Sequence, residues 1–115
     1  MSKFMAFATQ IPKDKFNQWE KFAHKLNTEF RKEFNESRKN AGIHERTFLQ
    51  RTPVGDFVIV TLEGNEPLAA YEKIAKAQDS FTKWFLEEVK DIHGVDLTQP
   101  MDGLAPKLIV DSSNA

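Results

Sequence analysis

Two segments of this chain alternate like β-strands and carry apolar side chains on both of their faces. In residues 4–11 and 57–62 the alternating sets are Phe4, Ala6 and Ala8 against Met5, Phe7 and Ile11, and Phe57 and Ile59 against Val58, Val60 and Leu62. Successive side chains of a strand point to opposite sides, so neither face of a sheet built from these strands is suited to water. The chain offers only two helical segments, enough to cover one face. We therefore predict that a second copy of the chain covers the other face.

The first helical segment, residues 13–40, repeats apolar side chains at steps of three and four residues. The repeating residues are Phe16, Trp19, Phe22, Ala23, Leu26, Phe30 and Phe34. Arg38 and Lys39 in the predicted last turn, followed by Gly42, are typical of a helix C-terminus. One continuous helix of this length would extend about 42 Å, so we expect its far end to project beyond the sheet or to contact a partner.

A hairpin is predicted after this helix. Residues 44–52 alternate as a more polar strand, which is typical of a sheet edge. Pro53 and Gly55 then supply a tight turn into the strand at residues 57–62. These strands are expected to be antiparallel neighbours.

The second helical segment, residues 67–93, begins at a proline and ends before Gly94. Asp79 and Ser80 can cap a fresh start within it, so the pattern is also compatible with a break near Gln78.

The element order completes a prediction of fold class. Residues 95–106 contain prolines and a glycine typical of irregular chain, and the short apolar run at residues 108–110 is predicted as a last strand. The resulting order, βαββαβ, predicts an α+β, ferredoxin-like two-layer sandwich, with residues 1–115 as a single domain. The first and third strands should lie side by side at the centre, the second and fourth at the edges.

Composition excludes several classes of partner. The net charge of −1 and the pI near 6.3 provide no global field for nucleic acid or an anionic membrane. RNA-recognition domains share the βαββαβ order, but Asp56 beside Phe57 does not fit the basic and aromatic pattern they need. The absence of cysteine is compatible with a reducing compartment, and the first residues lack the apolar core of a signal peptide. We expect a cytoplasmic protein with no nucleic-acid or membrane partner.

Four segments carry a resemblance to a known family: GIHER at residues 42–46, LQRTPVGD at 49–56, FTKWF at 81–85 and HGVDL at 93–97. With the element order, they resemble an uncharacterised bacterial branch of the dimeric α+β barrel superfamily, in which ferredoxin-like protomers press their open sheet faces together. The resemblance covers nearly the whole chain. It implies a homodimer with a small-molecule cavity between each sheet and its helices. Because this superfamily includes cofactor-independent monooxygenases, haem-degrading enzymes, lactone isomerases and stress-response proteins, the resemblance does not fix an activity.

Five side chains are candidates for ligand binding. His93, at the predicted end of the second helix beside Trp84, could act as an acid, a base or a ligand, although a histidine there can equally cap the helix. Arg46 and Gln50 share one face of the second strand, with His44 two residues before them, so they could bind a carboxylate or a carbonyl oxygen. Charged side chains on an edge strand also prevent aggregation. Trp84 could stack on an aromatic ligand or belong to the core.

Other candidates have weaker support. Glu45 and Glu63 could supply a base in the same cavity, although a glutamate near a strand end is usually solvated. Glu20 and His24 lie four residues apart, but a metal site needs three or four ligands, so we expect no metal. Haem-degrading relatives would use an asparagine that the first strand lacks, so we expect no haem and no other cofactor.

These observations leave three functions open, because no catalytic motif identifies a reaction. The first is a homodimer that binds a small apolar or aromatic molecule between sheet and helices, with His93 the candidate catalytic residue if there is turnover. The second is a cofactor-independent monooxygenase or isomerase built on the same cavity. The third is a non-catalytic interaction protein that uses the long first helix, which carries eight lysines and arginines against five acids in residues 12–41.

Overall fold

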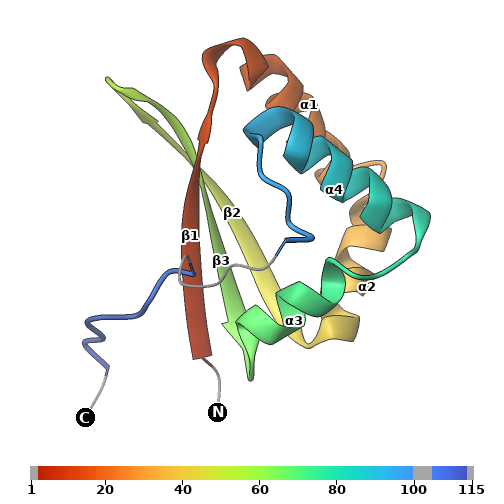
Figure 1. The fold of residues 1–115 in the computed structure, drawn as a ribbon, viewed down its shortest axis with the longest axis vertical. Helices are drawn as coiled ribbons and strands as arrows, with labels where there is room; N and C mark the ends of the chain where they lie inside the picture. Colours follow the sequence, from red (N-terminus) through yellow and green to blue (C-terminus); the bar gives the residue numbers. More distant parts are fainter. Residues whose placement is uncertain (1–2, 100–104, 114–115) are drawn as a thin grey trace.

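The computed structural model of the chain describes residues 3–99 and 105–113, and it has an antiparallel sheet with helices on one of its faces (Figure 1). The elements are β1 (Lys3–Ile11), the 3-10 turn η1 (Lys13–Lys15), α1 (Phe16–Asn27), α2 (Arg31–Ala41), β2 (Ile43–Thr52), β3 (Gly55–Gly64), α3 (Pro67–Ile74) and α4 (Ser80–His93). The predicted α+β class is confirmed, and the arrangement is compatible with a ferredoxin-like fold.

The sheet has the order β1-β3-β2 among the described residues, and both neighbouring pairs are antiparallel. The predicted pairing of the first and third strands and the edge position of the second are therefore confirmed. The β2–β3 hairpin is confirmed as well, with Thr52 opposite Gly55. The Thr52 hydroxyl donates to the carbonyl oxygen of Gly55 at 2.6 Å and accepts from the amide of Val54 at 3.2 Å, which closes the turn.

The predicted fourth strand at residues 108–110 is wrong. Leu108, Ile109 and Val110 form no strand and are exposed, and the segment lies away from the helices at the lower end of the molecule (Figure 1). Three apolar residues after Pro106, which has no amide hydrogen, offer few ladder hydrogen bonds to the free edge of β1. Residues 100–104 of the predicted irregular crossing lie outside the described residues.

The prediction of one continuous first helix is also wrong, because the helix breaks at Thr28. The Thr28 hydroxyl donates to the carbonyl oxygen of His24 at 2.7 Å, and the amide of Phe30 reaches back to Lys25. The amide of Phe30 thus bonds five residues back instead of four, which interrupts the α-helical hydrogen-bond pattern. The break redirects α2 so that it contacts α3 and β2 instead of projecting (Figure 1).

The break in the second helical segment is confirmed. Helix α4 begins after Asp79, whose carboxylate accepts hydrogen bonds from the amide and the hydroxyl of Thr82 at 2.9 and 2.8 Å. This is the capping arrangement expected at a helix start. At the other end, Gly94 adopts the left-handed conformation with φ of 72°, which favours glycine.

The core lies between the sheet and the helices, and aromatic side chains dominate it. Phe22 packs on Phe85 with ring centroids 5.4 Å apart, and Phe30 packs on Trp84 at 4.5 Å. From the strands, Val58, Val60 and Leu62 point into this core. The odd-numbered residues of β1 and the even-numbered residues of β3 therefore face the helices.

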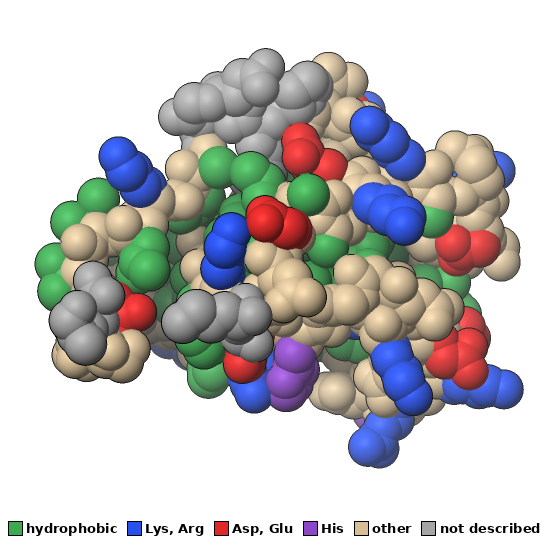
Figure 2. Space-filling model, turned by 90° about the horizontal axis from the view of Figure 1, so that it is seen from below, with side chains coloured by type: hydrophobic (Ala, Val, Ile, Leu, Met, Phe, Trp, Pro, Cys, Tyr) green, Lys and Arg blue, Asp and Glu red, His purple; other side chains and the backbone are tan. Residues whose placement is uncertain are grey.

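The opposite sheet face has no helix on it in the described part of the chain (Figure 1). Phe4 and Phe48 on this face are 59% and 51% exposed. Seen from below, charged side chains gather on the helix side, at right, and hydrophobic side chains reach the surface on the side of the sheet and the C-terminal segment (Figure 2). None of the helices described by the structure is long and apolar enough to span a bilayer.

Candidate ligand cavity

A cavity of about 540 Å³ lies between the sheet and the helices. Its walls are mainly apolar and come from all three strands and from α1 to α4; they include Trp19, Phe22, Ala23, Val58, Val60 and Val89. This volume falls in the range of small-molecule sites. A cavity was expected at this position, and the structure contains it.

A buried ion pair lies at one end of the cavity. Arg38 is 4% exposed, and its Nε donates to the Glu45 carboxylate at 2.7 Å. Its Nη1 donates to the Ser37 hydroxyl at 2.9 Å, whereas Nη2 is buried without a hydrogen-bond partner among the described residues. Glu45 lines the cavity. Glu45 is thus the member of the pair that lines the cavity, whereas Arg38 is not among the lining residues.

Aromatic rings enclose this guanidinium. Its central carbon lies 4.7 Å from the ring centroid of Phe34, 4.6 Å from that of Phe85 and 5.8 Å from that of Tyr71. All of these rings line the cavity. Burial raises the pKa of the Tyr71 hydroxyl far above its usual range, and the Glu45 carboxylate raises it further. The hydroxyl therefore remains protonated and uncharged beside the ion pair.

The short α2–β2 connection brings this pair together. Arg38 occupies the last turn of α2, which ends at Gly42 in the left-handed conformation with φ of 77°. The chain then enters β2 at once, and Glu45 faces the helices opposite Leu62. Because the chain reverses over one residue, side chains seven positions apart meet face to face.

His93 lies at the other end of the cavity. Its Nδ1 is 3.1 Å from the carbonyl oxygen of Gln10. A carbonyl oxygen can only accept, so Nδ1 carries the proton and Nε2 keeps its lone pair. Partial burial lowers the pKa of His93, and the bond to Gln10 offsets this only in part. The imidazole is therefore neutral at pH 7 and can accept a hydrogen bond.

The register of the sheet separates these polar ends. His93 bonds Gln10, whereas Glu45 is level with Met5 through their common neighbour Leu62. Five residues along β1 at about 3.4 Å each correspond to about 17 Å. The cavity is thus elongated, with an apolar middle and polar groups at both ends.

The structure does not bring the five predicted site residues together. His93 lines the cavity, but His44, Arg46 and Gln50 lie on the opposite face of the sheet, because β2 directs Glu45 and Leu49 to the helices. Arg46 donates there to Glu63 at 3.3 Å.

Trp84 is not among the residues that line the cavity. Its ring packs on those of Phe22 and Phe30. Its indole therefore belongs to the aromatic core between α1, α2 and α4.

Sequence reasoning missed the buried positions of Arg38 and Tyr71. A signal for Arg38 was present, because Arg38 continues the four-residue steps of Phe30 and Phe34 on the buried face of the helix. A charged residue within an apolar stripe indicates a buried partner. Nothing in the sequence pairs it with Glu45 before the turn at Gly42 is known.

Among the residues that the structure describes, no three histidine, aspartate or glutamate side chains gather as a metal site requires. Comparison with known proteins gives no further guide, since no family model, curated protein or solved structure matches the chain.

Proposed function

We propose that this protein is a homodimer of the dimeric α+β barrel type that binds a small, largely apolar or aromatic molecule between its sheet and helices. The observation that carries the proposal is the 540 Å³ cavity with aromatic and aliphatic walls. Sites for small molecules are typically apolar with a few polar groups that fix orientation, and Glu45 and His93 are such groups here.

Binding is better supported than catalysis. His93 and Glu45 are groups of the cavity that could exchange a proton, and the positions on β1 with which they are level, Gln10 and Met5, lie about 17 Å apart along the strand. One reacting centre cannot contact both. A monooxygenase or isomerase on this cavity would depend on one of its ends alone, either on His93 or on Glu45 with the protonated Tyr71 hydroxyl beside it.

The dimer is proposed from the uncovered sheet face. Three strands spaced by about 4.8 Å and about 33 Å long give a flat footprint of about 475 Å² on each copy, or about 950 Å² in total. Specific interfaces usually bury about 1,200–2,000 Å². The exposed apolar residues Leu108, Ile109 and Val110 are suited to supply the remainder.

Tryptophan fluorescence tests the ligand. The chain has two tryptophans, and Trp19, unlike Trp84, lines the cavity. A Trp84→Phe variant therefore reports on the cavity alone. We expect saturable changes in its emission with small aromatic compounds such as fluorene.

A filled cavity supplies the control. Ala23→Phe places a ring in the cavity and should abolish the response, whereas Ala69→Phe, on the exposed side of α3, should leave it intact. A response that survives Ala23→Phe would show that the ligand binds elsewhere, and no response to any aromatic compound would refute the proposed function.

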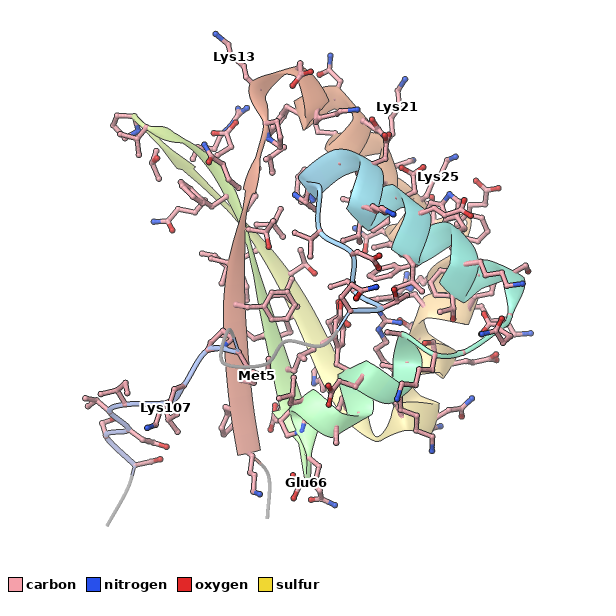
Figure 3. The ribbon with its side chains drawn as sticks, in the orientation of Figure 1. Met5, Lys13, Lys21, Lys25, Glu66 and Lys107 are labelled. Carbon is pink, nitrogen blue, oxygen red and sulfur yellow. The ribbon has the colours of Figure 1, made fainter. Side chains whose placement is uncertain are left out.

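Sedimentation tests the dimer. At micromolar concentration we expect twice the chain mass of 13.2 kDa. Phe48→Glu, on the open sheet face, should give the single-chain mass because it places a charge in an apolar contact. Lys21→Glu is the matched control, since Lys21 points away from the sheet on the outer side of α1 (Figure 3). A wild-type particle of single-chain mass would rule out the barrel.

A further inference from the structure

The second carboxylate oxygen of Glu45 is open to the cavity. Oε1 accepts from Arg38 Nε at 2.7 Å, and no described residue donates to Oε2. In the described part of the chain, Arg38 Nη2 is the one fully buried side-chain nitrogen or oxygen without a hydrogen-bond partner, so Oε2 retains accessible surface. Because the Glu45 side chain is only 3% exposed and lines the cavity, we assign this surface to the cavity wall.

An acceptor of this kind favours a ligand that donates a hydrogen bond. A carboxylate oxygen that has lost most of its water without gaining a donor is unfavourable, and more so than a neutral acceptor. The walls around it are mainly apolar. A donor on the ligand would therefore replace the lost water at Oε2.

We propose that Glu45 Oε2 anchors the ligand by accepting a hydrogen bond from a neutral hydroxyl group, so that the cavity selects aromatic alcohols and phenols over hydrocarbons, ketones and carboxylic acids. This inference rests on the proposed function and names the ligand class of the same cavity.

The ligand is inferred to be neutral because Arg38 already balances the charge of Glu45. A ligand carboxylate would be repelled by the Glu45 anion, and the described residues that line the cavity include no lysine or arginine to attract it. A ligand cation would add a third buried charge to a pair that is already balanced. A hydroxyl group donates to Oε2 without adding charge.

Tyr71 favours a hydroxyl group over other donors. It lines the same end of the cavity, with its ring centroid 5.8 Å from the guanidinium carbon of Arg38. Burial and the Glu45 carboxylate raise the pKa of the Tyr71 hydroxyl, so this hydroxyl keeps its proton and can donate. A ligand hydroxyl can donate to Glu45 and accept from Tyr71, whereas a ketone cannot donate and an ammonium group cannot accept.

The ligand body is inferred to be aromatic because aromatic side chains form the walls near Glu45. Phe34 and Phe85 stack with ring centroids 6.3 Å apart, and those of Phe7 and Tyr71 are 5.8 Å apart. All four rings line the cavity. Planar rings pack well against such walls in offset or tilted geometry.

Three probes with one ring system test the inference. 2-Methylfluorene carries a methyl group similar in size to a hydroxyl, 2-hydroxyfluorene supplies the donor, and fluorene-2-carboxylate carries a negative charge. In calorimetry on the wild-type protein, we expect 2-hydroxyfluorene to bind at least about tenfold more tightly than 2-methylfluorene, because hydrogen bonds to charged acceptors are strong. The carboxylate should bind more weakly than 2-hydroxyfluorene.

A double variant removes the acceptor without leaving a buried charge. In Arg38→Met with Glu45→Leu, the ratio of the affinities for 2-hydroxyfluorene and 2-methylfluorene should fall to about one. A general disturbance of the cavity would weaken both probes alike and leave the ratio unchanged. The matched control, Arg51→Met with Asp56→Leu, removes an exposed ion pair outside the cavity and should retain the ratio.

His93→Leu tests the acceptor at the other end of the cavity. The substitution removes the imidazole that is bonded to Gln10, and it should change the affinities for both probes alike, so that the ratio stays at about tenfold. Because His93 is partly exposed, this variant keeps the inference testable if the double variant does not fold.

The outcomes separate this inference from the proposed function. If neither 2-methylfluorene nor 2-hydroxyfluorene binds the wild-type protein, the proposed function fails. If the two bind equally well, the cavity is a ligand site but Glu45 does not anchor the ligand, and the inference is overturned. Tighter binding of the carboxylate would overturn the neutral hydroxyl. Loss of the ratio in His93→Leu, or its persistence in the double variant, would overturn the assignment to Glu45.

Discussion

Replacing Glu45 by leucine should destabilise the protein far more than the small change in side-chain volume suggests. The substitution removes the acceptor of the 2.7 Å bond from Arg38 and leaves a guanidinium that is 4% exposed without a counter-charge. Breaking a buried ion pair by removing one partner costs about 3–5 kcal/mol. The free energy of unfolding of a domain of this size is about 5–15 kcal/mol, so the Glu45→Leu variant would lose a large share of it.

The same magnitude can be expressed as a melting temperature. For 115 residues, an unfolding entropy of about 2.1 cal/mol/K per residue gives about 0.24 kcal/mol/K in total. A loss of about 3–5 kcal/mol then lowers the melting temperature by about 12–20 °C. Urea unfolding followed by circular dichroism would measure the free energy directly, with an unchanged slope expected.

Two further variants make this prediction sharp. Combining Glu45→Leu with Arg38→Met should recover most of the lost stability, because apolar replacement of both partners is often neutral or stabilising. Glu63→Leu breaks the matched but exposed pair with Arg46, whose side chains are 31% and 47% exposed, and should cost at most about 1 kcal/mol. The reasoning is refuted if Glu45→Leu and Glu63→Leu have similar effects, or if the double variant is as unstable as Glu45→Leu.

Three other predictions concern single positions. Asp79→Ala removes the acceptor for Thr82 at the start of α4 and should cost about 0.5–2 kcal/mol in urea unfolding; Asp79→Asn, which keeps a capping oxygen, should cost less. Gly64→Ala would place a Cβ 2.5 Å from the carbonyl oxygen of Gly42, so the β3 end must shift, at a cost of about 1–3 kcal/mol; an unchanged melting temperature would contradict this. The pKa of His93 is lowered below 6.5 on folding, so near and below pH 6.5 the unfolded chain binds more protons than the folded chain, and the free energy of unfolding should decrease as the pH is lowered. His93→Asn should weaken this pH dependence, and an identical pH profile of the variant would contradict the assignment.

The elements that the sequence predicted correctly are those whose signals are local. Gly42 and Gly94 end helices because a left-handed residue is needed there, and Asp79 begins one through its own side chain. Strand pairing followed from the turn at Pro53 and from the apolar character of β1 and β3.

The orientation of β2 could not be predicted, because both of its faces mix polar and apolar residues. Ile43 and Leu49 share one face with Glu45, while Phe48 shares the other with Arg46. Alternation establishes which residues share a face, but only packing of the whole sheet decides which face meets the helices. For the same reason, the predicted set of Arg46, Gln50 and His44 was placed with His93 although the sheet separates them.

The helix break at Thr28 and the missing pairing at residues 108–110 depend on tertiary context. A helical stripe of aromatics continues through Thr28 without interruption in the sequence, and packing of Phe30 on Trp84 redirects the chain. In contrast, the apolar run at the C-terminal end has strand-like composition but forms no ladder. Propensity is overridden in both places by the contacts available.

The strand order has a consequence for how the chain reaches its native state. The β2–β3 hairpin closes over Pro53 and Val54, whereas β1 can join β3 only by closing the long stretch between Ile11 and Asp56. Each doubling of loop length adds about 0.6 kcal/mol of entropic cost, so the hairpin should form early and β1 should dock late. The cavity, which needs β1 and α4 together, would then be among the last parts of the molecule to assemble and among the first to open.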